Sequence, residues 1–376
     1  MRIIVNARFL IKDKLEGIGW FSHEVLRRMV NEHPEDEFIF LFDRPFDPSF
    51  IYGPNVKGVV LFPPARHPFL WFAWFEIAVA NYLNKQKDAI FFSPDSYLSL
   101  RAKCKQVMVC HDIAFMHYPQ YVPKLVNWYY RYFTPRFLNK ADRIITVSDF
   151  VKKDIAQTYG TALERIDVAN NAAREVFKPL DLDEKDAVKA RYTEGKPYFL
   201  YVGAIHPRKN VETIVKGFEL FKAANKTDHK LVLLGRLAWQ TDEFEKMISN
   251  SEYSDDIILP GYATSDELVR ITAGAEAMLY MSKSEGFGIP LLEALKCDVP
   301  LIVSDKTSLP EVAGDAAIIV PVTDIKLLAV AMKNITEDES LRAELLAAGT
   351  TQLEKYTWEK AASVCYASIQ KVTSSD

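Results

Sequence analysis

Two glutamates, Glu285 and Glu293, stand eight positions apart around a short glycine-containing segment. Gly286 and Gly288 keep this loop thin, so that backbone amides can approach a ligand, and Pro290 suits the first turn of a helix. We expect an exposed helix N-terminus here, whose free N–H groups and partial positive charge attract phosphate. Both carboxylates can accept hydrogen bonds from hydroxyls. Phosphate together with many hydroxyls describes a nucleotide-sugar.

A simpler interpretation stays open for Glu293. A carboxylate in the first turn of a helix stabilises that helix by roughly 0.3–1 kcal/mol without any ligand. Glu285 is harder to explain in this way, because it lies between a serine and a glycine loop and has no helix to serve.

A basic pair, Arg208 and Lys209, follows the predicted strand 198–203. Asn210 is the predicted N-cap of a helix that begins at Val211. The pair then lies at a strand-to-helix turn, where charge-assisted hydrogen bonds of roughly 1.5–3 kcal/mol each would suit a diphosphate. The alternative is an exposed basic pair beside a helix.

His111 and Asp112 follow the apolar predicted strand 106–110. An imidazole at the carboxyl end of a strand can donate to a sugar hydroxyl or phosphate, and its neutral form can also accept. The alternative is a histidine satisfied by the adjacent aspartate. Ser93 and Asp95 end the preceding strand, where they would shape the acceptor side.

The elements that position these residues alternate between short apolar strands and longer amphipathic helices. This alternation predicts parallel sheets covered by helices, a doubly wound α/β fold. A chain of 376 residues is too long for one ordinary core, so two domains are expected. The predicted strands are 2–6, 37–42, 57–61, 89–92, 106–110, 143–147, 165–168, 198–203, 230–234, 256–259, 276–280, 300–303 and 316–319.

Composition narrows the class of protein. A net charge of −4 gives no overall attraction to nucleic acid. The four cysteines show no metal-binding spacing, which is typical of reduced thiols in a cytosolic protein. The N-terminus runs straight into a strand, not a signal peptide, and no uncharged stretch reaches the length of a membrane span. We expect a cytoplasmic protein, with peripheral membrane contact as an option.

The segment 284–296 resembles the E-x7-E signature of retaining glycosyltransferases of family 4, the group 1 transferases with the GT-B fold. The resemblance continues through Ser304-Asp305 and through 308–314, and it covers nearly the whole chain. It implies two Rossmann-like domains facing each other across a cleft. The acceptor-side domain would comprise 1–173 and a returning C-terminal helix in 357–376, and the donor-binding domain would comprise 174–356.

The resemblance also implies roles for residues. Glu285 would hold the donor sugar by its hydroxyls and Glu293 the ribose, while the basic pair faces the diphosphate. Many relatives carry arginine where this chain has Ala204, so Arg208 would supply that charge. The implied catalytic residues are His111, Glu285, Arg208 and Lys209. The implied donor-binding residues are Gly17, Gly19, Gly203, Arg208, Lys209, Gly235, Pro260, Tyr262, Glu285, Gly286, Phe287, Gly288, Ile289 and Glu293, and the acceptor-side residues are Ser93, Asp95 and Asp112.

Other cofactor chemistry is not indicated. The Gly17-x-Gly19 pair lacks a third glycine and a ribose-binding acid, which argues against a nicotinamide cofactor. No Asp-x-Asp pair ends a strand, so we expect no metal and no other cofactor. The leaving diphosphate would be neutralised by the cations and the helix end.

The expected reaction moves a hexose from a nucleotide-diphosphate sugar to a saccharide or lipid-linked saccharide, in surface polysaccharide or lipopolysaccharide synthesis. The subgroup is similar to mannosyltransferases, so GDP-mannose is the first candidate donor and a UDP-sugar the second. Two alternatives are a sugar-nucleotide 2-epimerase of the same fold and a non-catalytic sugar-nucleotide-binding protein.

Two aromatic stretches, 68–75 and 128–133, leave two interpretations open. Aromatic residues at helical spacing often belong to a core. The alternative is a surface that meets a lipid-linked acceptor at an anionic membrane.

Overall fold

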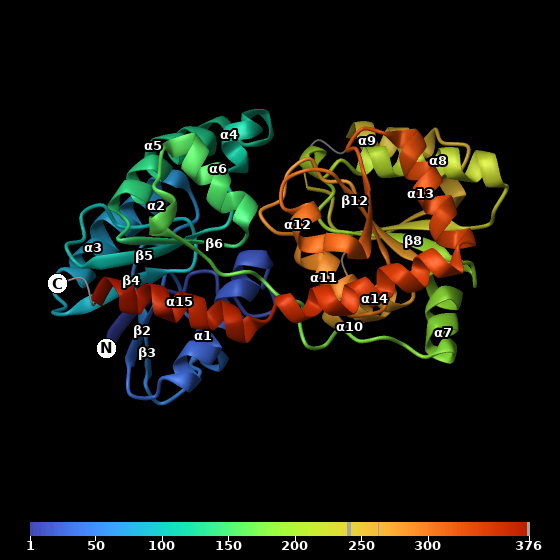
Figure 1. The fold of residues 1–376 in the computed structure, drawn as a ribbon. Helices are drawn as coiled ribbons and strands as arrows, with labels where there is room; N and C mark the ends of the chain where they lie inside the picture. The colour runs from blue at the N-terminus through green and yellow to red at the C-terminus, as the bar shows by residue number, and fades with distance from the viewer. Residues whose placement is uncertain (239–241, 262, 374–376) are drawn as a thin grey trace. The chain divides into compact units, whose positions relative to one another are not determined.

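The structure is a computed structural model, and it describes residues 1–238, 242–261 and 263–373. The chain divides into two compact units. Unit 1 is Met1–Asn171 together with the C-terminal segment from Thr357, and unit 2 is Ala172–Tyr356. Each unit is a parallel sheet covered by helices (Figure 1), which confirms the predicted α/β class.

Unit 1 holds a seven-stranded sheet of order β3-β2-β1-β4-β5-β6-β7, in which every neighbouring pair is parallel. Its strands are β1 (Arg2–Asn6), β2 (Glu37–Phe42), β3 (Val56–Val60), β4 (Ala89–Ser93), β5 (Lys105–Cys110), β6 (Arg143–Thr146) and β7 (Ile166–Val168).

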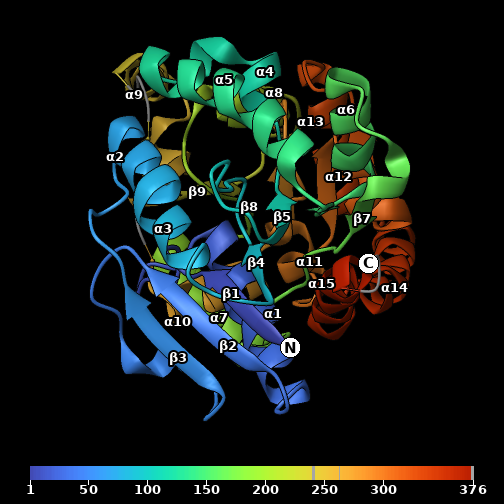
Figure 2. The ribbon, with the colours of Figure 1, turned by 90° about the vertical axis from the view of Figure 1, so that its left-hand side faces the viewer.

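Helices cover both faces of this sheet (Figure 2), with α1 and α15 on one face and α5 and α6 on the other. The C-terminal helix α15 therefore packs on the first unit, and Arg28 on α1 holds Glu359 on α15 by an ion pair of 2.8 Å. The helices are α1 (Gly17–Glu32), α2 (Pro68–Ala73), α3 (Ala80–Leu83), α4 (Ala114–His117), α5 (Lys124–Lys140), α6 (Asp149–Tyr159) and α15 (Trp358–Thr373), with a π-helical turn (Trp74–Val79) between α2 and α3 and 3-10 turns at Pro48–Phe50, Pro119–Tyr121 and Leu163–Arg165.

Unit 2 holds a six-stranded parallel sheet of order β10-β9-β8-β11-β12-β13. Its strands are β8 (Tyr198–Val202), β9 (Lys230–Leu234), β10 (Ile257–Gly261), β11 (Ala277–Tyr280), β12 (Leu301–Ser304) and β13 (Ala317–Val320).

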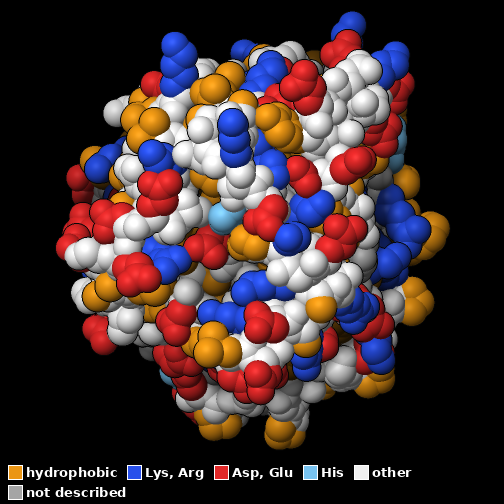
Figure 3. Space-filling model, turned by 90° about the vertical axis from the view of Figure 1, so that its right-hand side faces the viewer, with side chains coloured by type: hydrophobic (Ala, Val, Ile, Leu, Met, Phe, Trp, Pro, Cys, Tyr) orange, Lys and Arg blue, Asp and Glu red, His pale blue; other side chains and the backbone are white. Residues whose placement is uncertain are grey.

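In unit 2, α8 and α13 pack together on one face, while α11, α12 and α14 lie on the other (Figure 1). Figure 3 shows a face of the molecule on which cationic and anionic side chains are interspersed. The helices are α7 (Leu182–Thr193), α8 (Val211–Asn225), α9 (Asp242–Ser249), α10 (Ser265–Ala273), α11 (Ile289–Leu295), α12 (Leu309–Ala313), α13 (Ile325–Glu337) and α14 (Glu339–Lys355), with 3-10 turns at Pro207–Lys209, Ser254–Asp256 and Gly314–Ala316.

Each sheet has a point at which the strand order reverses. In unit 1 this point lies between β1 and β4, and in unit 2 it lies between β8 and β11. In doubly wound folds, ligands bind outside the carboxyl ends of the strands at such a switch point. The loops that follow β8 and β11 are therefore where unit 2 is expected to bind a ligand.

Candidate active site

Lys209 and Glu285 meet at the switch point of unit 2. Lys209 lies in the turn after β8, and its Nζ donates to Oε1 of Glu285 in the loop after β11. Arg208 lies beside them, with its Nη1 3.8 Å from Glu285 Oε2 and donating to the backbone carbonyl of Ser284. Two cations thus surround one carboxylate, and the cluster keeps a net positive charge.

Glu285 is held as a carboxylate. Burial raises the pKa of its carboxyl, but the charges of Lys209 and Arg208 outweigh burial and hold the pKa below its usual value. Ser282 Oγ also donates to Glu285 Oε1, at 2.7 Å. An ionised, fully hydrogen-bonding carboxylate accepts hydrogen bonds from hydroxyls, and it does not serve as a proton donor.

The loop that was expected to be exposed is buried. Residues 285–288 are all buried, and Ile289 and Pro290 are half-buried. Helix α11 begins at Ile289 with Pro290 in its first turn, as predicted, and Leu291, Leu292 and Leu295 are buried. The glycine-containing loop lies against the segment after β12, because Ser308 Oγ donates to the carbonyls of Glu285 and Phe287.

Glu293 has a partner that the sequence does not indicate. Nε of Arg174 donates to Glu293 Oε1 at 2.6 Å, and both side chains are at most 10% exposed. Burial raises the pKa of Glu293 more than Arg174 lowers it, so the pKa lies above its usual value. The first-turn interpretation of Glu293 is wrong, since no acidic residue lies in the first turn of α11.

Asn210 precedes α8, as predicted, but its side chain does not cap the helix. The residue adopts a positive φ of 57°, and its Nδ2 donates to the carbonyls of Met281 and Val322. Its amide therefore ties the turn after β8 to the segments after β11 and β13. The capping prediction failed because the backbone of Asn210 is left-handed and its Oδ1, the atom that would cap the helix, accepts the hydroxyl of Thr213 at 3.0 Å instead.

Glycines lie at the carboxyl ends of three strands, directly after β8 and β9 and as the last residue of β10. Gly203, Gly235 and Gly261 all have positive φ values, and a Cβ on Gly235 would lie 2.0 Å from the carbonyl oxygen of Gly203. Only glycine permits this approach of two strand ends. Pro260 lies within β10, and Tyr262 lies outside the described residues.

His111 follows β5 in unit 1, and its partner is not the neighbouring aspartate. Its Nε2 lies 2.8 Å from the carbonyl oxygen of Pro94. A carbonyl only accepts, so Nε2 carries the proton and Nδ1 of the neutral ring is an acceptor. Burial lowers the pKa of His111 and favours this neutral form. Asp112 instead accepts the backbone N–H of Ala114, at 3.0 Å.

Ser93 and Asp95 are buried at the switch point of unit 1. Ser93 Oγ donates to Asp95 Oδ1 at 3.0 Å, and Asp95 Oδ2 accepts from Nε of Arg8 at 2.7 Å. Arg8 also lies 4.1 Å from the ring centroid of Tyr97, and its place beside Asp95 is not predicted from the sequence. Its only local signal is an arginine two residues beyond the end of β1.

Gly17 is the first residue of helix α1, and Gly19 lies in the first turn of this helix. Gly17 is exposed with no heavy atom near its missing side chain, whereas a Cβ on Gly19 would lie 3.0 Å from the carbonyl oxygen of Phe9. Gly19 is therefore required by packing. Within the described residues, no cluster of three metal-ligating side chains occurs.

Comparison with known proteins identifies the family. Residues 16–173 match Glycosyltransferase Family 4, and residues 183–352 match Glycosyl transferases group 1. The chain is a group 1 glycosyltransferase of the family 4 type. The glycosyltransferase is 29% identical to "O-antigen chain mannosyltransferase B" of Escherichia coli, over 95% of this chain and 96% of that protein.

Solved structures place the fold of this glycosyltransferase in the GT-B class. Sucrose-phosphate synthase from Thermosynechococcus elongatus matches with a TM-score of 0.79 and 16% identity, over 100% of both chains. HepE of Anabaena, solved in complex with UDP-glucose, matches with a TM-score of 0.74 and 14% identity, again over 100% of both chains. Family membership makes the chain a transferase, which answers the epimerase and non-catalytic alternatives.

Proposed function

We propose that this glycosyltransferase moves a hexose from a nucleotide-diphosphate sugar to a saccharide or lipid-linked saccharide acceptor in surface polysaccharide synthesis. The observation that carries the proposal is the meeting of Lys209 and Glu285 at the switch point of unit 2. A cationic cluster suits the diphosphate, and a buried carboxylate suits the hydroxyls of the sugar.

Mannose is the proposed sugar and GDP-mannose the proposed donor, with a UDP-sugar as the second candidate. Support comes from the E. coli relative, whose name describes an O-antigen chain mannosyltransferase and 96% of whose length is matched. The complex of HepE with UDP-glucose supports a nucleotide-sugar donor of this general kind.

The proposed reaction keeps the configuration of the sugar and uses no metal. The acceptor hydroxyl oxygen bonds to the anomeric carbon while the bond from this carbon to the diphosphate oxygen breaks. The hydroxyl proton passes to a phosphate oxygen of the departing nucleoside diphosphate. Arg208 and Lys209 stabilise the negative charge that develops on this leaving group.

The protein groups around this reaction hold its parts in place. Glu285 accepts hydrogen bonds from the sugar hydroxyls, and Glu293 accepts them from the ribose. In unit 1, Nδ1 of His111 is the acceptor that would receive a hydrogen bond from a sugar hydroxyl. Because the pKa of Glu285 is lowered, this residue is not assigned the part of a general acid.

A binding and turnover experiment tests these assignments. Thermal shifts with GDP-, UDP- and dTDP-sugars identify the base, and release of GDP from GDP-mannose measures turnover. We expect Glu293→Ala to weaken nucleotide binding, and Glu285→Gln to lower turnover while binding is largely kept. Glu344→Gln, on the exposed surface of α14, is the control. If both site variants bind and turn over the donor like the parent, the assignments are wrong.

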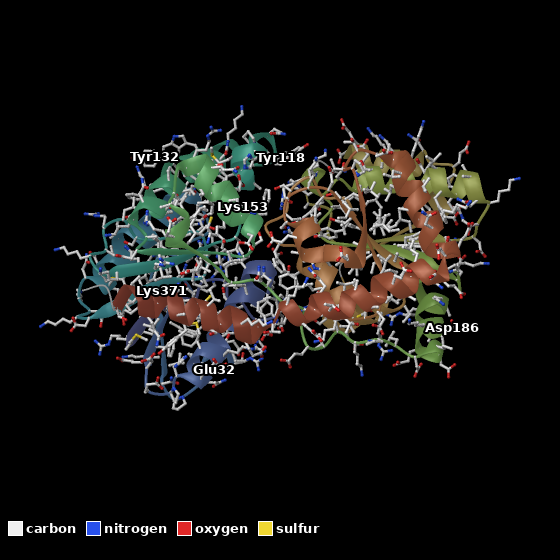
Figure 4. The ribbon with its side chains drawn as sticks, in the orientation of Figure 1. Glu32, Tyr118, Tyr132, Lys153, Asp186 and Lys371 are labelled. Atoms are coloured by element: carbon white, nitrogen blue, oxygen red, sulfur yellow. The ribbon has the colours of Figure 1, made fainter. Side chains whose placement is uncertain are left out.

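A face of unit 1 supports a lipid-linked acceptor. Phe69 and Phe72 on α2 and Trp128 and Tyr132 on α5 are each more than 40% exposed, and Figure 4 locates Tyr132 on α5. Phe72 contacts the buried ring of Phe133, which contacts Tyr132 in turn, so the exposed aromatic residues of the two helices are joined through the packing between α2 and α5. No helix among the described residues is long and apolar enough to span a membrane.

The charges on this face complement an anionic bilayer. Helix α5 carries Lys124, Arg131, Arg136 and Lys140 and no acidic residue. We propose that α2 and α5 rest on an anionic membrane surface that holds the acceptor lipid. The same two stretches also contribute to the core, as the core interpretation predicts, since Trp74, Phe75, Tyr129 and Phe133 are buried.

Sedimentation with vesicles tests the membrane face. The parent should sediment with vesicles that contain anionic lipid at low salt and be released as salt rises. Trp128→Ser combined with Tyr132→Ser should abolish sedimentation. Leu182→Ser removes an apolar side chain that is 78% exposed in unit 2 and should change nothing. A parent that stays in solution with these vesicles contradicts this proposal.

A further inference from the structure

The segment after β12 supplies the hydrogen bonds that hold the backbone around Glu285. The hydroxyl of Thr307 accepts the backbone N–H of Glu285 at 3.0 Å. Ser308 Oγ donates to the carbonyl of Glu285 at 3.1 Å, and Ser304 Oγ donates to the carbonyl of Ser282 at 2.6 Å. Glu285 therefore has both of its backbone polar groups bonded to hydroxyls from one neighbouring segment.

Thr307 makes its contact from an unfavourable backbone conformation. Its φ is +56°, in the left-handed region, where a branched Cβ is crowded. Among the non-glycine residues with positive φ in the described part of the chain, Thr307 alone is β-branched. Such a conformation persists only where its surroundings enforce it, and here Ser308 and Leu309 are both completely buried.

Thr307 contacts Glu285, the residue that holds the donor sugar in the proposed reaction. Lys209 and Arg208 both attract the carboxylate of Glu285, so the backbone must resist this pull for the carboxylate to stay aimed at a sugar. A bond to the Glu285 N–H fixes the start of that side chain. A displacement of one ångström at a reacting centre is enough to lower turnover strongly.

We infer that Thr307 is a positioning residue, whose hydroxyl fixes Glu285 for the sugar and whose strained backbone is retained for that purpose. The inference rests on the proposed function. A purely structural role for Thr307 makes a different prediction, since a residue kept for stability would not occupy a conformation that glycine adopts more easily.

Three substitutions separate the hydroxyl from the strain. Thr307→Val removes the hydroxyl and keeps the branched shape, Thr307→Ser keeps the hydroxyl, and Thr307→Gly removes both the hydroxyl and the strain. Thr323→Val, which removes an exposed hydroxyl from another loop of unit 2, is the matched control. Turnover is measured as GDP release from GDP-mannose, and stability as Tm.

We expect the valine and glycine variants to lose kcat on the order of tenfold, the effect of one hydrogen bond. KM should stay within about twofold, because the nucleotide is bound elsewhere, and the serine variant should recover most of kcat. The glycine variant should have a higher Tm than the valine variant, because both lose the bond to the Glu285 N–H and only glycine relieves the strain. Turnover lost to the same extent in both variants, despite this difference in Tm, indicates a positioning role.

Two outcomes overturn the inference. One is parent-like kcat in Thr307→Val or Thr307→Gly, which would show that the hydroxyl is dispensable. The other is a decrease of both kcat and Tm in all three variants, the serine variant included, which would show a structural role. Glu285→Gln, measured alongside, separates the failures. If it also turns over normally, the proposed function of the site fails, whereas if it alone is impaired, only the role of Thr307 fails.

Discussion

Replacing Arg174 by methionine should destabilise unit 2 strongly, because Glu293 would then lose its buried partner. The pair is 2.6 Å long and its side chains are 10% and 6% exposed. Removing one member of a buried ion pair costs about 3–5 kcal/mol. In a domain of this size each kcal/mol lowers Tm by about 2–4 °C, so a decrease of roughly 6–20 °C is expected. Methionine retains an apolar chain over Phe177, whose ring Arg174 covers at 4.7 Å.

The loss should depend on pH with a definite sign. Burial already raises the pKa of Glu293 above 4.5, and Arg174 is the main group that opposes this rise. A raised folded-state pKa contributes stability that is present below pH 4.5 and is lost as pH rises through the folded-state value. Without Arg174 this pKa rises further. The decrease in Tm relative to the parent should therefore be largest near neutral pH and become smaller toward pH 4.5.

The assay is a melting curve of parent and variants between about pH 4.5 and 8. Adding Glu293→Gln to Arg174→Met removes the unpaired charge and should restore most of the Tm at neutral pH. Arg191→Met is the control, because its 2.7 Å pair with Glu267 leaves Arg191 64% exposed, and such pairs contribute about 0–1 kcal/mol. A Tm for Arg174→Met within 2 °C of the parent at all pH values would show that the buried pair does not stabilise unit 2. A double variant as unstable as the single one would show that the unpaired charge of Glu293 is not the cause of the loss.

Three further outcomes are expected. The pKa of Glu285 is lowered, so the stability that this carboxylate contributes is present above pH 4.5 and is lost as pH falls through its folded-state pKa. In melting curves, Lys209→Met should move this loss of stability to higher pH. An unshifted curve would argue against the pair of Lys209 with Glu285. Burial lowers the pKa of His111 below 6.5, so kcat/KM should not fall between pH 6.5 and 8 through this residue, while His111→Phe should lower it at least tenfold across that range. EDTA should leave the thermal shift by GDP-mannose unchanged, and a reduced shift would contradict metal independence.

The fold could be predicted almost completely from the pattern of apolar residues. Every predicted strand is found, with its ends within two residues of the prediction. The reason is that parallel strands buried on both faces read as continuous apolar runs, such as the fully buried β4 and β9. In doubly wound folds, the residues that bind ligands follow the carboxyl ends of strands. Lys209 and Glu285 follow β8 and β11 in this way, and the structure brings them together.

What the sequence did not reveal depends on pairs that are distant along the chain. Arg174 and Glu293 are 119 positions apart, and Arg8 and Asp95 are 87 positions apart. Nothing near Arg174 distinguishes it from a loop arginine. Asn210 shows the same limit of local rules, since its Nδ2 donates to two carbonyls on other segments while its Oδ1 accepts the Thr213 hydroxyl and does not cap the helix.

The two switch points explain why the donor is assigned to unit 2. In each unit, a cation after the first central strand pairs with a carboxylate after its neighbour: Arg8 with Asp95 in unit 1 and Lys209 with Glu285 in unit 2. The pair in unit 1 is only 5% and 1% exposed, and Arg8 lies against the rings of Phe9, Phe75 and Tyr97.

Aromatic rings offer no hydrogen bonds to a diphosphate. The charge of Arg8, the cation at the switch point of unit 1, is already neutralised by Asp95. In unit 2 the carboxylate is surrounded by two cations and by hydroxyls, and the cluster retains positive charge. The switch point of unit 1 is thus filled by packed aromatic side chains, whereas the switch point of unit 2 remains polar. If this reasoning is correct, Arg8→Met should lower Tm without changing the thermal shift by GDP-mannose, whereas Lys209→Met should reduce that shift.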